Sequence, residues 1–250
     1  MALSIHALPA GVLRNFPSAA LTYQRGFGQV QDCPQIMFAI LGGPSPVLVD
    51  TGTPDPAFVR EYHGYDFERD EQEHPLATLA GLGVRPEDVE VVIHTHLHWD
   101  HCGNDALFPA ARFVVQRSEV AYASDPLPPN RVAFERVGEV EPPWKAVESS
   151  FELVDGDAEV LPGISVIHLP GHTPGSQGVL VETAGGPYLI AGDTVNTYRN
   201  WEGDGTLPHL LNGSLISLPD HWRSFERIAE TGATVIPSHD PLVLQRGVFD

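Results

Sequence analysis

The segment from residue 94 to residue 101 constrains the fold more than any other part of the chain. It reads His-Thr-His-Leu-His-Trp-Asp-His, so four histidines and one carboxylate occupy eight positions. The run before it, Val89 to Ile93, has β-branched apolar residues at four of its five positions and predicts a buried strand. Because side chains alternate along an extended chain, His96 and His98 point in the same direction. A turn after them would bring Asp100 and His101 to a second position, next to the one that His96 and His98 face.

This density of polar side chains predicts a metal site. Buried imidazoles and a carboxylate without a partner would each cost a few kcal/mol of desolvation, and coordination removes that cost. Imidazole and carboxylate ligands suit zinc, and also iron, manganese or cobalt. His94 has the same parity as His96 and His98 but lies one residue pair back toward the strand interior. We therefore interpret His94 as a residue that supports the ligands from behind.

The rest of the chain has the pattern of an α/β protein. Helical spacing predicts short helices over 76–82 and 118–123, and a longer one with Asp220 as its N-cap and Gly232 as its stop. Strands interleaved with helices, with polar residues at strand ends, indicate an α/β fold whose site lies along one edge of the sheets. The length of 250 residues fits a single domain over residues 1–250. Short apolar runs predict further strands over 36–41, 47–49, 112–116, 164–169, 178–182, 188–191 and 234–236.

The composition of the chain limits the classes of partner that we expect. The formal net charge of -19 argues against a nucleic-acid partner and against an anionic membrane surface, because both require a basic face. The N-terminus lacks the charged and apolar regions of a signal peptide, and we expect a cytoplasmic protein. The two cysteines, Cys33 and Cys102, do not make a disulfide framework and are expected to be small buried apolar residues.

The histidine segment resembles a known signature. His96-x-His98-x-Asp100-His101 is similar to the HxHxDH motif of the metallo-β-lactamase superfamily. Segments similar to the other motifs of that superfamily follow in the same order, so the resemblance covers nearly the whole chain. They lie at 47–52, 171–176, 192–194 and 238–240.

The resemblance implies a fold and a ligand set. The implied fold is an αββα four-layer sandwich, with two metal ions, zinc or other divalent transition metals, at the shared edge of two sheets. Asp193 and a hydroxide would bridge the two ions, and Asp50 would stabilise the site from behind. By the same resemblance, one ion would be held by His96, His98 and His172, and the other by Asp100, His101 and His239.

The implied activity is hydrolysis of an ester-like bond by attack of the bridging hydroxide, with Asp100 passing a proton to the leaving oxygen. Within the superfamily the chain is most similar to the N-acyl-homoserine lactonases, through residues 97–101, 111–119, 154–157 and 160–163. Those enzymes carry a tyrosine three residues after the bridging aspartate, where this chain has Asn196. We expect Asn196 to act as a weaker donor to the substrate, with Tyr198 compensating if the loop folds back.

Alternatives to lactone hydrolysis stay open. Another ester, a thioester as in glyoxalase II, or a cyclic amide would suit the same chemistry, and a metal-binding protein without turnover is a further class. The expected partner is a small ester or lactone, and the resemblance suggests a homodimer. Aromatic and apolar residues expected near the mouth of the pocket are Tyr23, Phe27, Met37, Tyr198 and Trp201.

Overall fold

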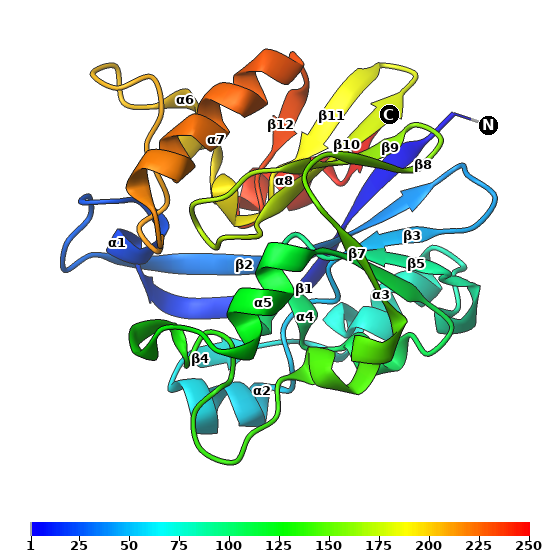
Figure 1. The fold of residues 1–250 in the computed structure, drawn as a ribbon, viewed down its shortest axis with the longest axis horizontal. Helices are drawn as coiled ribbons and strands as arrows, with labels where there is room; N and C mark the ends of the chain where they lie inside the picture. Colours follow the sequence, from blue (N-terminus) through cyan, green and yellow to red (C-terminus); the bar gives the residue numbers. More distant parts are fainter. Residues whose placement is uncertain (1) are drawn as a thin grey trace.

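The computed structural model describes residues 2–250 and contains two β-sheets packed face to face (Figure 1). The larger sheet has eight strands in the order β13-β1-β2-β3-β5-β6-β7, with β4 paired to β1. Its strands are β1 (Ser4–Pro17), β2 (Val30–Leu41), β3 (Val47–Val49), β4 (Asp66–Glu68), β5 (Val91–Ile93), β6 (Arg112–Gln116), β7 (Phe151–Val154) and β13 (Val248–Phe249). The five-stranded sheet has the order β12-β11-β10-β9-β8, formed by β8 (Ala158–Leu161), β9 (Ile164–His168), β10 (Gln177–Thr183), β11 (Gly186–Ile190) and β12 (Thr234–Ile236).

Helices cover the outer face of each sheet. In Figure 1 the long helix α7 lies over the five-stranded sheet, and α3 lies below the eight-stranded sheet. The predicted αββα sandwich is therefore confirmed. The helices are α1 (Ser18–Leu21), α2 (Pro56–Phe58), α3 (Pro75–Gly81), α4 (Trp99–Cys102), α5 (Arg117–Ser124), α6 (Tyr198–Glu202), α7 (Leu218–Thr231) and α8 (Pro241–Arg246).

Strand alternation builds three apolar layers. Along β2, Phe38 and Ile40 join the core between the two sheets, while Met37 and Ala39 join a second core that includes Leu79 of α3. A third cluster joins α7 to the outer face of the five-stranded sheet. Side chains of successive strand residues point to opposite faces, so a strand buried on both faces reads as a continuous apolar run. This explains why the predicted strands lacked an alternating polar pattern.

The longest strand, β1, was not predicted. Its sequence contains Pro9 and Gly11, both unfavourable in a regular strand. The pairing of β1 with β2 shifts register between Pro9 and Val12, and Gly11 has a φ of 109° there. A bulge therefore accommodates both residues, and local sequence alone gives no sign of it.

Helix α7 begins earlier than predicted. Ser217, not Asp220, is its N-cap, and the Ser217 hydroxyl accepts a hydrogen bond from the Asp220 amide. The predicted stop is confirmed, because Gly232 adopts the left-handed conformation with a φ of 65°. Within residues 2–250 no helix combines the length and apolar character needed to cross a membrane.

Several strands end at the same edge of the sandwich. The chain leaves β5 at Ile93 just before the histidine segment, and it leaves β11 at Ile190 just before Asp193. Strand β12 runs parallel to β11 and ends two residues before Ser238, the neighbour of His239. Segments far apart in the sequence therefore deliver their polar residues to one place.

Candidate metal centre

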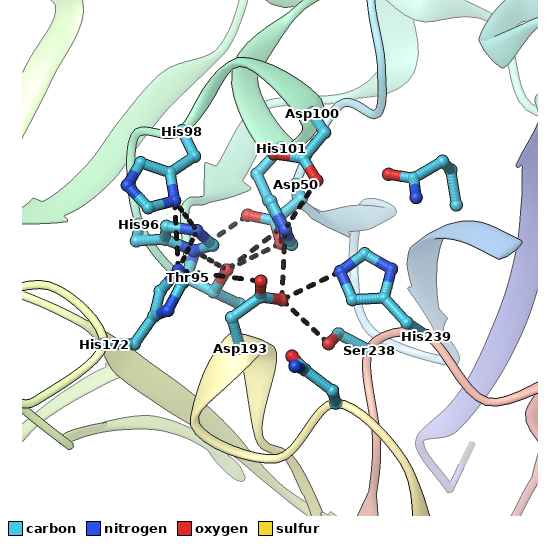
Figure 2. Close-up of polar contacts among 12 residues, drawn as sticks. Asp50, Thr95, His96, His98, Asp100, His101, His172, Asp193, Ser238 and His239 are labelled. Atoms are coloured by element: carbon cyan, nitrogen blue, oxygen red, sulfur yellow. Dashed lines mark hydrogen bonds and ion pairs between the residues drawn. The ribbon is translucent and has the colours of Figure 1, made fainter. Parts of the chain in front are cut away.

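Three histidines converge from two loops to form the first ligand group (Figure 2). The Nε2 atom of His96 lies 3.0 Å from Nδ1 of His98, and the Nε2 atom of His172 lies 3.2 Å from the first and 3.0 Å from the second. Nitrogens bound to one tetrahedral zinc ion at about 2.0–2.1 Å are roughly 3.3–3.4 Å apart. The spacing of the three nitrogens is thus close to that of ligands around a single ion.

A second group lies beside the first and shares a carboxylate with it. The Oδ1 atom of Asp193 lies 3.0 Å from Nε2 of His239 and 3.2 Å from Nε2 of His101. The other carboxylate oxygen, Oδ2, lies 3.6 Å from Nε2 of His172 in the first group. Asp100 completes the second group, with its Oδ2 atom 3.8 Å from Nε2 of His101. All seven residues predicted as ligands are brought together, and Asp193 faces both groups.

The orientation of the imidazoles fits cation binding. The Nδ1 atoms of His172, His239 and His101 lie 2.6 Å from the Ser214 carbonyl oxygen, 2.9 Å from the Pro34 carbonyl oxygen and 2.7 Å from Asp50 Oδ2, respectively. These acceptors fix the proton on Nδ1 and leave the Nε2 lone pair free for a metal. The buried Nε2 atom of His101 has no hydrogen-bond partner. The donor set therefore fits two divalent metal ions.

Electrostatics favour the metal-binding forms of His96 and Asp193. Burial and the neighbouring imidazoles of His101, His98 and His172 hold the pKa of His96 well below its usual value. Although burial alone raises the pKa of Asp193, His239 and His101 hold it well below the usual value. Neutral imidazoles and an ionised carboxylate are the forms that bind metal ions. Against the effect of burial, Asp193 and Asp100 raise the pKa of His101, and Cys33 and Asp193 raise the pKa of His239.

A buried network behind the ligands holds the histidine segment in place. Asp50 accepts a hydrogen bond from the Thr95 amide at 2.8 Å through one carboxylate oxygen, and the other contacts His101. His94 does not point at either ligand group: its Nε2 atom lies 3.1 Å from the buried Asp105 carboxylate. Both Asp50 and His94 thus lie in the supporting positions that the sequence suggested.

Glu119 ties the two ligand loops together, and sequence reasoning missed it. Its Oε1 atom accepts a hydrogen bond from the Leu97 amide at 2.9 Å. Its Oε2 atom accepts from the Thr173 hydroxyl at 2.6 Å and from the Gly175 amide at 3.0 Å. Burial raises the pKa of Glu119, while these three hydrogen bonds oppose the rise. One buried carboxylate therefore connects the loop carrying His96 and His98 to the loop carrying His172.

A cavity of about 180 Å³ opens onto both ligand groups. Asn196 lines it, and its side chain donates to the Leu21 carbonyl oxygen and accepts from Asn212. Tyr198 does not reach the cavity, because α6 begins at this residue and its ring packs against the core between the sheets. The other residues expected at the mouth, Tyr23, Phe27, Met37 and Trp201, are also absent from the lining.

The cavity wall is instead built largely from residues that carried no sequence signal. They include Phe16 and Leu13 of β1, His63 and Tyr65, and Val132. The only hint was the aromatic segment Tyr62-His63-Gly64-Tyr65, which matches no motif of the superfamily. The cysteines are both buried and free, as predicted, and Cys33 contributes to the lining.

Comparison with known proteins agrees with this geometry. The chain is 32% identical over 222 residues to an N-acyl homoserine lactonase from a Bacillus species, covering 85% of this chain and 84% of the relative. It is 34% identical over 182 residues to the N-acyl homoserine lactonase AttM of Azorhizobium caulinodans, covering 68% and 65%.

Solved structures give the same picture of the fold. An N-acyl homoserine lactone hydrolase with N-hexanoyl-L-homoserine bound at its catalytic metal centre superposes with a TM-score of 0.79 at 23% identity, covering 98% of this chain and 97% of the other. The dizinc quorum-quenching lactonase AidC superposes with a TM-score of 0.71 at 16% identity, covering 98% and 89%. The sequence profile of the metallo-β-lactamase superfamily matches residues 33–239, which span the ligands from His96 to His239. The chain therefore belongs to the metallo-β-lactamase superfamily.

Proposed function

We propose that this chain is a dinuclear metal hydrolase that opens a lactone ring, with N-acyl homoserine lactones as the substrate class. The observation that carries the proposal is the position of Asp193, whose two carboxylate oxygens face different ligand groups at the floor of one cavity. A substrate in that cavity would meet both ions at once. The relatives described above support the choice of a lactone over other esters, thioesters and cyclic amides.

The ligand groups define what each part of the site would do. Two divalent ions, when bound, would supply an activated water molecule and polarise the carbonyl oxygen under attack. His96, His98 and His172 would hold one ion, Asp100, His101 and His239 the other, and Asp193 would contact both. In the hydrolysis, the carbonyl carbon gains an oxygen from water, the ring C–O bond breaks, and the ring oxygen leaves as a hydroxyl group.

Asp100 is proposed as the proton donor to that leaving oxygen. Its carboxylate lines the cavity and is 15% exposed, so it can contact both the second ligand group and a bound substrate. Asn196, which also lines the cavity, is proposed as a substrate contact. One hydrogen of its amide is used by the Leu21 carbonyl oxygen, which leaves the other for a substrate oxygen.

Finer features of the proposal are zinc as the native metal, a homodimer, a cytoplasmic location and a single domain over residues 1–250. Imidazole and carboxylate ligands in this ratio suit zinc. The single domain is supported by the shared apolar core of the two sheets. Elemental analysis of gently purified protein and light scattering would test the first two directly.

A substrate panel tests the proposed function. Hydrolysis rates would be measured for N-acyl homoserine lactones, simple lactones, thioesters, β-lactams and phosphodiesters, with zinc-loaded and metal-stripped protein. We expect lactones to be turned over fastest, and only by the loaded protein. A preference for thioesters or β-lactams would replace the substrate class, and tight zinc binding without turnover of any ester would show a metal-binding protein.

A further inference from the structure

The amide side chains at the cavity floor have little hydrogen-bonding capacity left for a substrate. The Nδ2 atom of Asn212 donates to the backbone carbonyl oxygen of Asp193 at 2.7 Å and to the side-chain oxygen Oδ1 of Asn196 at 3.0 Å. Both of its hydrogens are therefore used. Asn196 has one hydrogen engaged by the Leu21 carbonyl oxygen at 3.2 Å. Asn196 thus keeps one hydrogen for a substrate oxygen, and any second donor has to come from another wall of the cavity.

Of the six tyrosines, Tyr65 is the one that lines the cavity. Within residues 2–250 no protein group forms a hydrogen bond with the Tyr65 hydroxyl. Tyr198 packs against the core between the sheets. The remaining four hydroxyls have partners: Tyr23 with Gln24, Tyr62 with Val137, Tyr122 with Asn130, and Tyr188 with Arg246.

The ring of Tyr65 is held from two sides. It stacks on Trp99, with centroids 6.1 Å apart and an angle of 13° between the planes, and it contacts Phe16 at 5.4 Å. Trp99 lies between the ligands His98 and Asp100 in the sequence, so the stack fixes Tyr65 relative to the metal centre. The residue is 36% exposed, which leaves part of the side chain accessible to a ligand.

The charges around Tyr65 keep its hydroxyl protonated. Burial raises the pKa of Tyr65, and the negative charge of Asp100 and the Cys33 thiol raise it further. The hydroxyl is therefore a donor at any pH near neutrality. Tyr65, Asp100 and Cys33 all line the same cavity.

We propose that the Tyr65 hydroxyl donates a hydrogen bond to the lactone oxygen on which negative charge develops during hydrolysis. This inference rests on the proposed function. It makes Tyr65 a catalytic residue contributed by the segment between α2 and β4, on the wall of the cavity and not on the loop after Asp193. The hydroxyl keeps its own proton throughout, so the covalent balance of the hydrolysis is unchanged. Removing one donor to a developing oxyanion lowers turnover by roughly 10²–10³-fold in well-studied hydrolases. Because Tyr65 is partly exposed to solvent, we expect a loss at or below the lower end of that range.

The test compares Tyr65→Phe, Tyr65→Leu and the control Tyr188→Phe. Tyr188→Phe also removes one phenol hydroxyl, but that hydroxyl binds Arg246 away from the cavity. Turnover and the Michaelis constant would be measured with N-hexanoyl homoserine lactone, together with zinc content and thermal stability. We expect Tyr65→Phe to lower kcat by about 10–100-fold, with KM changed less than about threefold and two zinc ions retained. Tyr188→Phe should keep the wild-type kcat.

The outcomes separate this inference from the proposed function. If the wild-type protein hydrolyses no lactone, the proposed function fails and the inference fails with it. If the wild-type protein is active and Tyr65→Phe is equally active, the inference alone is overturned. An active Tyr65→Phe beside a defective Tyr65→Leu would show that the ring only packs against Trp99, which also overturns it. A Tyr65→Phe protein that loses zinc would assign the residue to metal-site integrity and contradict a role in catalysis.

Discussion

The metal centre and the cavity wall above it are held by different kinds of contact. His101, His172 and His239 each fix a second ring nitrogen against a carboxylate or a backbone carbonyl group. On the wall, Tyr65 is placed by stacking, without a hydrogen bond that fixes its hydroxyl. Directional contacts define ligand positions closely, whereas stacking tolerates small shifts. The metal centre should therefore be intolerant of substitution, and the wall should be the adaptable part that sets substrate choice.

The largest effect is expected at the residue shared by both ligand groups. Asp193→Ala removes the carboxylate that faces His101, His239 and His172. Zinc content should fall below two ions per chain, and kcat/KM for a lactone should fall on the order of 10³-fold or more, because activation of the attacking water is lost. Elemental analysis and steady-state kinetics measure both. Two retained ions with near-normal activity would show that Asp193 is not shared between the metals.

Asp100→Asn tests the junction of the two regions, since Asp100 belongs to the second ligand group and lines the cavity. Loss of the proton donor combined with a weakened ligand should lower kcat by roughly 10²-fold or more. The fold and the first metal ion should be retained, which circular dichroism and zinc analysis would check. Wild-type turnover in Asp100→Asn would rule out its role as the acid.

Glu119→Gln tests the support of the metal centre separately from its ligands. Glu119 binds the loops that carry the ligands but forms no hydrogen bond with a ligand side chain. A glutamine has one oxygen where the carboxylate has two, so an amide N–H₂ must face the Leu97 amide or the Thr173 hydroxyl. Metal affinity should fall by about 10–100-fold, and excess zinc should restore much of the activity. Glu148→Gln, which changes an exposed residue paired with Lys145, is the matched control. Equal zinc affinity in the two variants would remove Glu119 from the support of the metal centre.

The smallest effect on turnover is expected at Glu135, which contacts the cavity-lining residue His63 but is not among the residues that line the cavity. His63 stacks on Trp99 at 4.1 Å and contacts the buried Glu135 carboxylate at 3.0 Å. Glu135→Ala leaves the buried His63 ring nitrogen without its hydrogen-bond partner and should lower the free energy of unfolding by about 1–3 kcal/mol. Zinc content should stay at two ions, and KM should rise only a few-fold. Loss of zinc in this variant would contradict the separation between wall and metal centre.

The residues predicted as ligands come together in the structure, and they lie in short motifs that the resemblance to the superfamily picks out. His96, His98, Asp100 and His101 lie in one short segment, and His172, Asp193 and His239 each follow a predicted strand. Strand ends on packed sheets meet at one edge, which agrees with the positions that the resemblance implied for His172, Asp193 and His239. The ligand set therefore came from motif positions and not from an account of long-range packing.

The cavity wall could not be predicted in the same way. Tyr198 was expected there because it lies two residues after Asn196, but Thr197 accepts a hydrogen bond from the Asn200 amide and starts α6 at this point. The helical turn directs the Tyr198 ring toward the core. Met37 was misplaced because its strand is buried on both faces, and nothing in the sequence distinguishes the two. Tyr65 enters the cavity only through its stack on Trp99, a contact between segments distant in sequence.

A zinc titration of the metal-stripped protein tests the central claim most directly. Hydrolysis of N-hexanoyl homoserine lactone would be followed as zinc is added in fractions of an equivalent, with zinc binding measured on the same samples. The account predicts negligible activity without metal and a rise that reaches its plateau at about two zinc ions per chain, as expected for two adjoining ligand groups. Full lactone hydrolysis by the stripped protein, or a plateau at one ion with no further binding, would contradict a dinuclear lactonase.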